Sequence, residues 1–468
     1  MYKIIEKRLD LPLDHDWAPI DYSSIPDTTA ADYQNRIDRL WHMPEAKDYA
    51  CLIIYADREH FSNMHYLTGY DPRFEESLLI LVPGRTPILI VGNEGLGYTK
   101  NIPYEIDIKL YQRFSLMGQP NENGDKLAEL LATCAIPDKG LVGLVGFKHY
   151  GDARQSPMLI TDVPHYIVQT LDDVIGMKRI RNATDLFADC VYGLKHQLSA
   201  KEIVQFEAIG TKVSRGVYRS ICDLRPNVSE IEASQSYLMD GEPSNTHPNL
   251  NFGDVNVAKG LASPSYHQTL HYGDFVSTGY GRRGTLVHRI GIYARNADDI
   301  PQARKDYLEE HVKPYFASVV RWYEMMQLGR KCGEIWQMVE DWIGFDKFNI
   351  ILNPGHLMHT DEWTNSPFVK DSAVRISSGM AFQCDYTVAF KEPYMACHME
   401  DSLVIADKAL REAVQALSPE CWKRIEARRN FMIHTLNIAL PEEVLPLSDL
   451  SGVYFPYMAD TRTILAKV

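Results

Sequence analysis

Two histidines and two carboxylates gather in one short stretch of the chain, residues 353–363. His356, His359, Asp361 and Glu362 follow a Pro-Gly turn within it. Imidazoles and carboxylates are the side chains that bind divalent metals and that move protons in enzymes. The stretch therefore predicts a metal site or an acid–base site, and it makes an enzyme the leading interpretation of the chain.

Further ionisable residues lie on or beside apolar segments that read as strands, namely His288, Asp385 and Glu400. A strand aims only alternate side chains toward a core, so a buried metal site needs ligands from several strands. Buried charge is costly unless it is paired or bound to a metal. With His356, these residues predict a metal shell of two imidazoles and two carboxylates. The alternative is that each histidine is an ordinary hydrogen-bonded core residue and that Asp385 and Glu400 form ion pairs with Arg289.

The loop after the first of the two clustered histidines allows two interpretations. His359, Asp361 and Glu362 form either a general acid–base loop at the mouth of a pocket or a loop whose acids are solvated or cap a helix. Trp363 indicates that the loop is ordered. The candidate catalytic residues are His356, His359, Asp361 and Glu362. Trp363 and Arg289 are candidate substrate-binding residues.

A second charged cluster lies in the first part of the chain. Arg73 and Glu75 follow the segment Tyr66-Leu-Thr-Gly-Tyr. They read either as a charged turn before a strand or as a substrate clamp that reaches over the other domain. In the second interpretation, Arg73 and Glu75 contact substrate.

The length of 468 residues predicts two domains, since single cores stop growing at roughly 250–300 residues. Residues 1–30 read as an irregular arm, residues 31–175 alternate strand and helix signals, and residues 176–468 form a second domain. Capping boxes at Ser199 and Ser229 predict two helix starts. Residues 301–328 predict a long amphipathic helix, residues 350–353 and 400–405 predict strands, and residues 406–440 predict a helical tail.

Composition excludes several classes of protein. The net charge of −14 argues against a nucleic-acid partner, because neutralising phosphates needs a basic surface. No apolar run approaches the roughly 20 residues of a membrane helix, and the N-terminus lacks the apolar core of a signal peptide. The eight cysteines include no C-x-x-C pair, which is typical of reduced thiols. We therefore expect a cytoplasmic protein without a membrane partner.

Several short motifs resemble those of the creatinase/aminopeptidase P/prolidase family, whose fold is called pita-bread. They are Tyr66-Leu-Thr-Gly, Leu198-Ser-Ala-Lys-Glu-Ile, Arg225-Pro-Asn-Val-Ser-Glu-Ile-Glu, Gly273-Asp-Phe-Val, Gly379-Met-Ala-Phe and Glu400-Asp. The resemblance implies an α/β N-terminal domain plus an α+β pita-bread C-terminal domain. It also implies a homodimer, in which the first domain of one subunit covers the pocket of the other.

The resemblance assigns metal ligands by position. In that family two aspartates, one histidine and two glutamates hold two metals. These positions carry His356, Asp385 and Glu400, with His288 at the second aspartate and Gly279 at the first. Glycine has no side chain to ligate, so the resemblance implies one divalent metal (Zn, Fe or Mn) rather than two. A metal-free site, as in the creatinase branch, is the rival interpretation.

The leading functional hypothesis is a hydrolase of a small polar C–N-bonded compound, of amide or guanidino type, rather than a general peptidase. One alternative is a lyase or another non-hydrolytic enzyme on the same scaffold. A second alternative is a catalytically inactive, peptidase-like binding protein, which the absence of a long acidic tail argues against.

Overall fold

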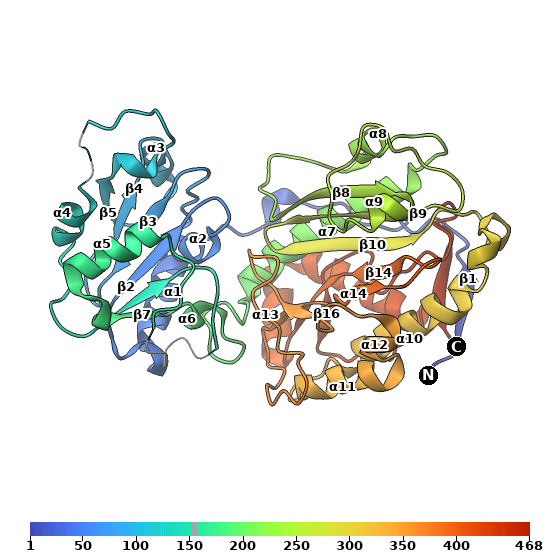
Figure 1. The fold of residues 1–468 in the computed structure, drawn as a ribbon. Helices are drawn as coiled ribbons and strands as arrows, with labels where there is room; N and C mark the ends of the chain where they lie inside the picture. Colours follow the sequence, from blue (N-terminus) through green and yellow to red (C-terminus); the bar gives the residue numbers. More distant parts are fainter. Residues whose placement is uncertain (123, 125, 152–157) are drawn as a thin grey trace. The chain divides into compact units, whose positions relative to one another are not determined.

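The chain folds into two compact units (Figure 1). A computed structural model describes residues 1–122, 124, 126–151 and 158–468. The smaller unit is Asp27–His196, and the larger unit combines Met1–Pro26 with Gln197–Val468. The smaller unit therefore runs beyond the predicted limits of 31–175. Residues 1–26 belong to the larger unit, where strand β1 pairs with the last strand, β17, and so they are not a separate arm.

A six-stranded mixed sheet forms the smaller unit, in the order β5-β4-β3-β2-β6-β7. Its central strand β2 is almost entirely apolar and buried, as expected for a strand covered on both faces. The strands are β2 (Tyr49–Ala56), β3 (Ser77–Leu81), β4 (Ile88–Val91), β5 (Asp107–Leu110), β6 (Leu141–Val145) and β7 (Ile180–Asn182). The helices are α1 (Ala30–His42), α2 (Ser62–Thr68), α3 (Gly95–Tyr98), α4 (Leu127–Ala132), α5 (His165–Ile175) and α6 (Asp185–Ala188). This is the predicted α/β module.

The larger unit contains three sheets, ordered β13-β14-β10-β9-β8, β11-β12-β15-β16 and β1-β17. All their strand pairs are antiparallel. The first sheet comprises β8 (Thr246–Phe252), β9 (Phe275–Arg282), β10 (Thr285–Ile292), β13 (Val388–Ala389) and β14 (Ala396–Glu400). The others comprise β11 (His356–Leu357), β12 (Ala381–Gln383), β15 (Ser402–Ile405), β16 (Val444–Pro446), β1 (Ile4–Arg8) and β17 (Thr463–Lys467).

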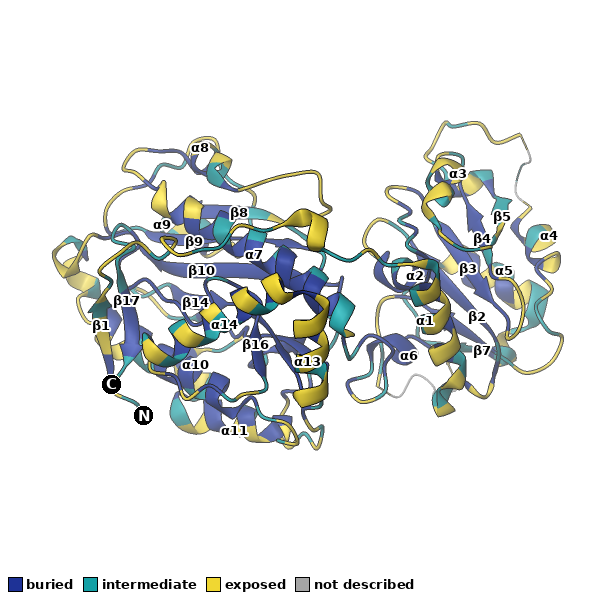
Figure 2. Cartoon of the chain, turned by 180° about the vertical axis from the view of Figure 1, so that it is seen from behind, coloured by how far each residue is buried: buried dark blue, intermediate teal, exposed yellow. Residues whose placement is uncertain are grey.

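Helices flank these sheets, and α7 packs against both β9 and β10. Figure 2 shows buried strands beneath helices whose outer faces are exposed, as on α13. The predicted capping boxes at Ser199 and Ser229 are confirmed: each serine and the glutamate three residues on satisfy each other's N–H groups. The helices are α7 (Ala200–Cys222), α8 (Glu230–Ala233), α9 (Gly253–Val257), α10 (Lys313–Met325), α11 (Cys332–Trp342), α12 (Phe345–Phe348), α13 (Lys408–Leu417) and α14 (Pro419–His434).

Three predicted elements differ from the structure. Residues 350–353 are not a strand; Ile350 makes only an isolated bridge, to Val388. The long helix over 301–328 is shorter, because α10 starts at Lys313 after a π-helical turn, η9 (Leu308–Val312). The predicted strand 400–405 is two strands, β14 and β15, which belong to different sheets and are separated by Asp401 alone.

Candidate functional site

The predicted metal ligands all lie in the larger unit, and all are buried. His288 lies on β10 directly opposite Glu400 on β14, because the two residues are register partners. His356 begins β11, and Asp385 follows β12. Since two strands of one sheet (β10 and β14) and two of another (β11 and β12) carry these residues on them or at their ends, the structure meets the requirement for ligands from several strands.

His356 lies among three carboxylates. Its Nε2 is 3.2 Å from Oε1 of Glu362, 3.7 Å from Oδ2 of Asp385 and 4.0 Å from Oε1 of Glu400. Single ligand atoms of His356, Glu362 and Glu400 all lie within 4.8 Å of one another, as a metal site requires. We call His356, Glu362, Asp385 and Glu400 the His356 cluster. Three of them were predicted ligands, and the fourth, Glu362, was predicted as an acid–base residue of the neighbouring loop.

Two atoms of the His356 cluster lack a hydrogen bond within the described residues: Nε2 of His356 and Oε1 of Glu400. Both atoms are buried, where a polar group without a partner is costly. A divalent cation coordinated by these atoms would satisfy both. The donor set of one imidazole and three carboxylates therefore fits a cation such as Zn, Fe or Mn.

The pKa shifts of the cluster reflect its crowded negative charge. Burial, together with the nearby Asp385 and Glu362 carboxylates, raises the pKa of Glu400 well above its usual range. Burial acts to lower the pKa of His356, but Glu362 and Asp385 outweigh it and raise that pKa above its ordinary value. A bound cation would oppose both shifts, because it favours the deprotonated form of its ligands.

His288 lies in a hydrogen-bonded chain beside this cluster. The Asp385 carboxylate only accepts, so Nε2 of His398 donates to its Oδ1 at 2.8 Å. In the neutral rings, Nδ1 of His398 then accepts from Nδ1 of His288 at 2.7 Å. Nε2 of His288 accepts in turn from Asn249 and Ser277. Burial, followed by the proximity of His398 and Arg289, lowers the pKa of His288 well below its ordinary value, which favours its neutral ring.

This chain changes the prediction for His288. Both of its ring nitrogens face hydrogen-bond partners, and it groups with His398 and Glu400 rather than with His356. His398 was missed by the sequence reasoning. The signal was present in His398-Met-Glu400, because alternate residues of a strand share a face.

Gly279 on β9 is the register partner of His288 on β10. A Cβ atom added at Gly279 would lie 2.5 Å from Cδ2 of His288, closer than real Cβ contacts. The backbone N–H of Gly279 donates to the hydroxyl of Tyr237 at 3.0 Å. The space beside Gly279 is therefore filled by the imidazole of His288, and no side chain fits there without displacing it.

The predicted acid–base loop divides into two parts. Glu362 reaches the His356 cluster, whereas Nε2 of His359 lies 3.6 Å from Oε1 of Glu202, the capping glutamate of α7. The His359 ring also makes an edge-on contact with Phe206 of the same helix. Asp361 is buried, and its carbonyl accepts from the backbone N–H of His359.

Trp363 covers the cluster. Its ring stacks on the imidazole of His356 with centroids 4.1 Å apart and planes 18° apart. The tryptophan therefore shields one face of the His356 imidazole from water.

Arg289 is buried in an ion pair with Asp401. Both it and Asp401 are about 1% exposed, and Nη2 of Arg289 lies 2.7 Å from Oδ2 of Asp401. Its remaining N–H groups donate to backbone carbonyls of His288, Glu400, Leu450 and Val453. The guanidinium is fully engaged, which corrects its predicted role in substrate binding: Arg289 joins strand β10 to β14 and to residues 450–453.

The charged cluster of the smaller unit is also engaged within that unit. Glu75 is buried, and its carboxylate accepts from the backbone N–H groups of Glu94 and Gly95 at 3.2 and 2.7 Å. Arg73 adopts a positive φ of 61° and lies 3.9 Å from Asp71. These contacts support the interpretation of a charged turn for Glu75, while the Arg73 side chain is 55% exposed.

Comparison with solved structures identifies the architecture. The chain is similar to the Xaa-Pro dipeptidase from Bacillus anthracis, with 14% identity, a TM-score of 0.59, and coverage of 81% of this chain and 96% of that one. It is similar to a prolidase from Thermococcus sibiricus, with 16% identity, a TM-score of 0.61, and coverage of 81% and 95%. It is also similar to a putative aminopeptidase P from Bacillus anthracis, with 11% identity, a TM-score of 0.55, and coverage of 84% and 99%.

No protein-family model and no curated protein matches the sequence. The structural likeness extends over nearly the whole length of each solved structure, and at these identities it establishes the fold alone. The predicted resemblance to the prolidase-type scaffold and its pita-bread fold is thereby confirmed. Among the described residues, no helix is long and apolar enough to cross a membrane.

Proposed function

We propose that this protein is a hydrolase that cleaves a C–N bond of amide or guanidino type in a small polar substrate, with one divalent cation at the His356 cluster. The observation that carries the proposal is the grouping of the buried His356, Asp385 and Glu400 with the partly exposed Glu362, in which Oε1 of Glu400 has no hydrogen-bond partner within the described chain. The solved structures of similar fold include an Xaa-Pro dipeptidase, a prolidase and a putative aminopeptidase P, which supports hydrolysis on this scaffold.

The side chains of the cluster divide into ligands and a proton acceptor. The side chains of Asp385 and Glu400 are 8% and 6% exposed, whereas that of Glu362 is 24% exposed. We assign His356, Asp385 and Glu400 to hold the cation, and Glu362, on the more open side, to accept the proton of the attacking water. A bound cation would lower the pKa of that water and polarise the bond under attack.

Neighbouring residues keep this arrangement fixed. His398 holds Oδ1 of Asp385, so that Oδ2 faces His356. Trp363 lies over His356 and excludes water from that face. In protein metal sites such outer partners orient the ligands, and losing an outer partner weakens metal binding.

A general peptidase with two metals is disfavoured by Gly279. The position that the resemblance gives to the first aspartate has no side chain, and the imidazole of His288 fills the space beside it. His288 and His398 bind each other, so their ring nitrogens are occupied unless that hydrogen bond breaks.

The test begins with protein purified without chelator. Elemental analysis should find one divalent metal per chain in the wild type and little in H356A, while E412Q, on the exposed side of α13, should match the wild type. Amides and guanidino compounds are then screened in heavy-oxygen water, where label in the product demonstrates hydrolysis. Active wild type without metal, or with two metals per chain, would overturn the single-cation proposal; turnover without label would overturn hydrolysis.

A further inference from the structure

A row of register partners crosses the five-stranded sheet of the larger unit and ends in the His356 cluster. From β8 to β14 the row consists of Asn249, Gly279, His288 and Glu400. Residues directly opposite each other on neighbouring strands share one face of the sheet. Because Gly279 has no side chain, the imidazole of His288 lies beside it and reaches Asn249, two strands away, with 3.1 Å between Nε2 and Nδ2. Gly279 thus permits a contact that skips a strand.

This contact belongs to a hydrogen-bonded network that ends on a proposed cation ligand. Nδ1 of His288 lies 2.7 Å from Nδ1 of His398, and Nε2 of His398 lies 2.8 Å from Oδ1 of Asp385. At the far end, Nε2 of His288 also lies 3.0 Å from the hydroxyl of Ser277 on β9. We call Asn249, Ser277, His288 and His398 the histidine network.

The two ends of the histidine network require the same direction of donation. The Asp385 carboxylate only accepts, so a neutral His398 donates from Nε2 and accepts at Nδ1. The proton between the two rings then belongs to Nδ1 of His288, and Nε2 of His288 accepts. Asn249 presents its amide nitrogen, which only donates, and the Ser277 hydroxyl is also able to donate. Donors at one end and an acceptor at the other therefore select one tautomer for each ring.

The far end of the network is closed. Asn249 and Ser277 are each 1% exposed. The carbonyl of Asn249 accepts from the hydroxyl of Tyr237 at 2.7 Å, and that hydroxyl accepts from the backbone N–H of Gly279 at 3.0 Å. An amide neither gains nor loses a proton near neutral pH, so the network is suited to holding Asp385 in place rather than to carrying protons to solvent.

We propose that Asn249 and Ser277 are positioning residues of the cation site, acting on Asp385 through the two histidines. They keep the first ring protonated at Nδ1, so that the second ring donates from Nε2 to Oδ1 of Asp385 and Oδ2 stays directed toward His356. Outer hydrogen bonds of this kind orient metal ligands. The proposal rests on the cation proposed for the His356 cluster and requires no contact between that cation and either positioning residue.

Nitrogen NMR of the imidazoles measures the tautomers in full-length, histidine-labelled protein freed of metal by a chelator. Loss of resonances in H288Q and H398Q assigns the two rings. In the wild type, His288 should be protonated at Nδ1 and His398 at Nε2. In N249D, whose carboxylate only accepts, His288 should carry a proton on Nε2. The opposite tautomers in the wild type, or an unprotonated Nε2 of His288 in N249D, would overturn the proposal.

Titration with Zn²⁺ measures the effect on the cation site. N249L and S277A should each weaken binding by about two- to tenfold, the worth of one hydrogen bond. The double variant N249L/S277A should weaken binding by about 10–100-fold, as the loss of an outer partner does. S277T keeps the hydroxyl and should stay closer to the wild type than S277A. An affinity unchanged in the double variant would contradict the positioning role.

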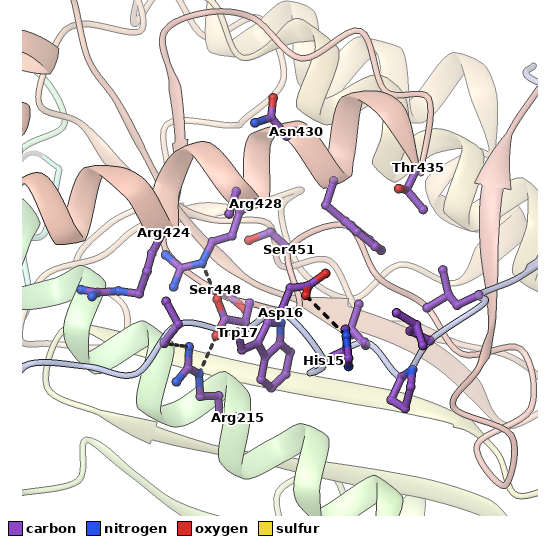
Figure 3. Close-up of a pocket in the computed structure, with 18 of the residues that line it drawn as sticks. His15, Asp16, Trp17, Arg215, Arg424, Arg428, Asn430, Thr435, Ser448 and Ser451 are labelled. Carbon is purple, nitrogen blue, oxygen red and sulfur yellow. Dashed lines mark hydrogen bonds and ion pairs between the residues drawn. The ribbon is translucent and has the colours of Figure 1, made fainter.

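Ser451 supplies the matched control for the loss of a buried hydroxyl. It is 3% exposed, and its Oγ has no hydrogen-bond partner within the described part of the chain. It lines a cavity of about 570 Å³ bordered by residues 9–18 and α14, and none of the described lining residues belongs to the histidine network or the His356 cluster (Figure 3). S451A should bind Zn²⁺ as the wild type does.

Melting temperatures near that of the wild type verify that each variant is folded. The outcomes separate the two proposals. A wild type that binds no Zn²⁺ refutes the proposed cation, whereas a wild type that binds Zn²⁺ no more tightly than N249L/S277A refutes the positioning role alone.

Discussion

The carboxylate of Asp401 lies 2.7 Å from the guanidinium of Arg289, at the one residue that separates strands β14 and β15. These strands belong to different sheets, so the ion pair lies where the chain passes from one sheet to the other. Glu400, immediately before it, is the last residue of β14 and a member of the His356 cluster. The pair thus fixes the strand end that carries a candidate ligand.

Removing Arg289 should therefore destabilise the larger unit severely. R289M leaves Asp401 buried without its partner, which costs about 3–5 kcal/mol. R295M is the matched control, because Arg295 pairs with Asp299 but its side chain is 60% exposed, and it should cost less than about 1 kcal/mol. Urea denaturation measures both free energies of unfolding, and equal losses would contradict the assigned role of Arg289.

Glu400 and Glu362 should respond differently to removal of their charge. E400Q should abolish stoichiometric metal binding, because it removes a buried ligand. E362Q should retain the metal but lower turnover by roughly 10²–10⁴-fold, the usual worth of a general base. Metal titration and product formation on the substrate found by screening distinguish the two. Loss of metal in E362Q equal to that in E400Q would make Glu362 a ligand instead.

His398 should act on the metal through Asp385. H398A frees Oδ1 of Asp385, and we expect metal affinity to fall by about 10–100-fold. H398Q, whose amide can also donate to the carboxylate, should recover part of the loss. Direct metal titration gives the readout without a substrate. An unchanged affinity in H398A would show that Asp385 needs no such partner.

Gly279 and His288 should be energetically coupled. G279D forces a side chain against the imidazole of His288 and should cost about 1–3 kcal/mol, as overpacking does. In G279D/H288A the imidazole is gone, so the double variant should lose less than the sum of the two single losses. Melting curves of the four proteins complete the double-mutant cycle, and strict additivity would exclude the steric coupling.

The smaller unit should show a pH-dependent stability that depends on His60. The hydrogen bond from His60 to Asp57, opposed by burial, raises the pKa of His60 above its ordinary value. The folded state therefore binds this proton more tightly than the unfolded chain. The contribution is fully present below about pH 6.5 and disappears as the pH rises through the folded pKa.

H60Q removes that contribution, so the gap in melting temperature between wild type and H60Q should be wider at about pH 6 than at about pH 9. In D57N, the pKa of His60 measured by NMR should fall. A gap that does not change with pH, together with an unmoved pKa in D57N, would show that the ion pair contributes nothing.

Sequence motifs were reliable where the interaction they predict joins residues close together in the chain. The capping boxes at Ser199 and Ser229 satisfy N–H groups within four residues, so residue type and spacing suffice to predict them. An apolar pattern alone was not sufficient to predict a strand over residues 350–353. Ile351 is 62% exposed, and no strand forms there. The break at Asp401 could not be predicted, because it depends on which sheet accepts each half of the segment.

The sequence predicted which residues meet around His356, but not the hydrogen-bond partners of His288 and Arg289. His356, Asp385 and Glu400 meet as expected, because all three lie on or beside strands of the core. His288 is hydrogen-bonded to His398, which lies on the neighbouring strand β14. This pairing depends on the register between two strands, which a single sequence does not reveal. The partners of Arg289 could not be predicted either, because Asp401, Leu450 and Val453 are distant from it in sequence.

The pairing of β1 with β17 has a consequence for the order in which the two units fold during synthesis. Ile4 lies opposite Lys467, so the larger unit needs both extremes of the chain, and the smaller unit is an insertion within it. The smaller unit is continuous in sequence and can fold while the ribosome is still translating the rest. Strand β1 is synthesised before the smaller unit, yet it gains its strand partner only when residues 463–467 have been made.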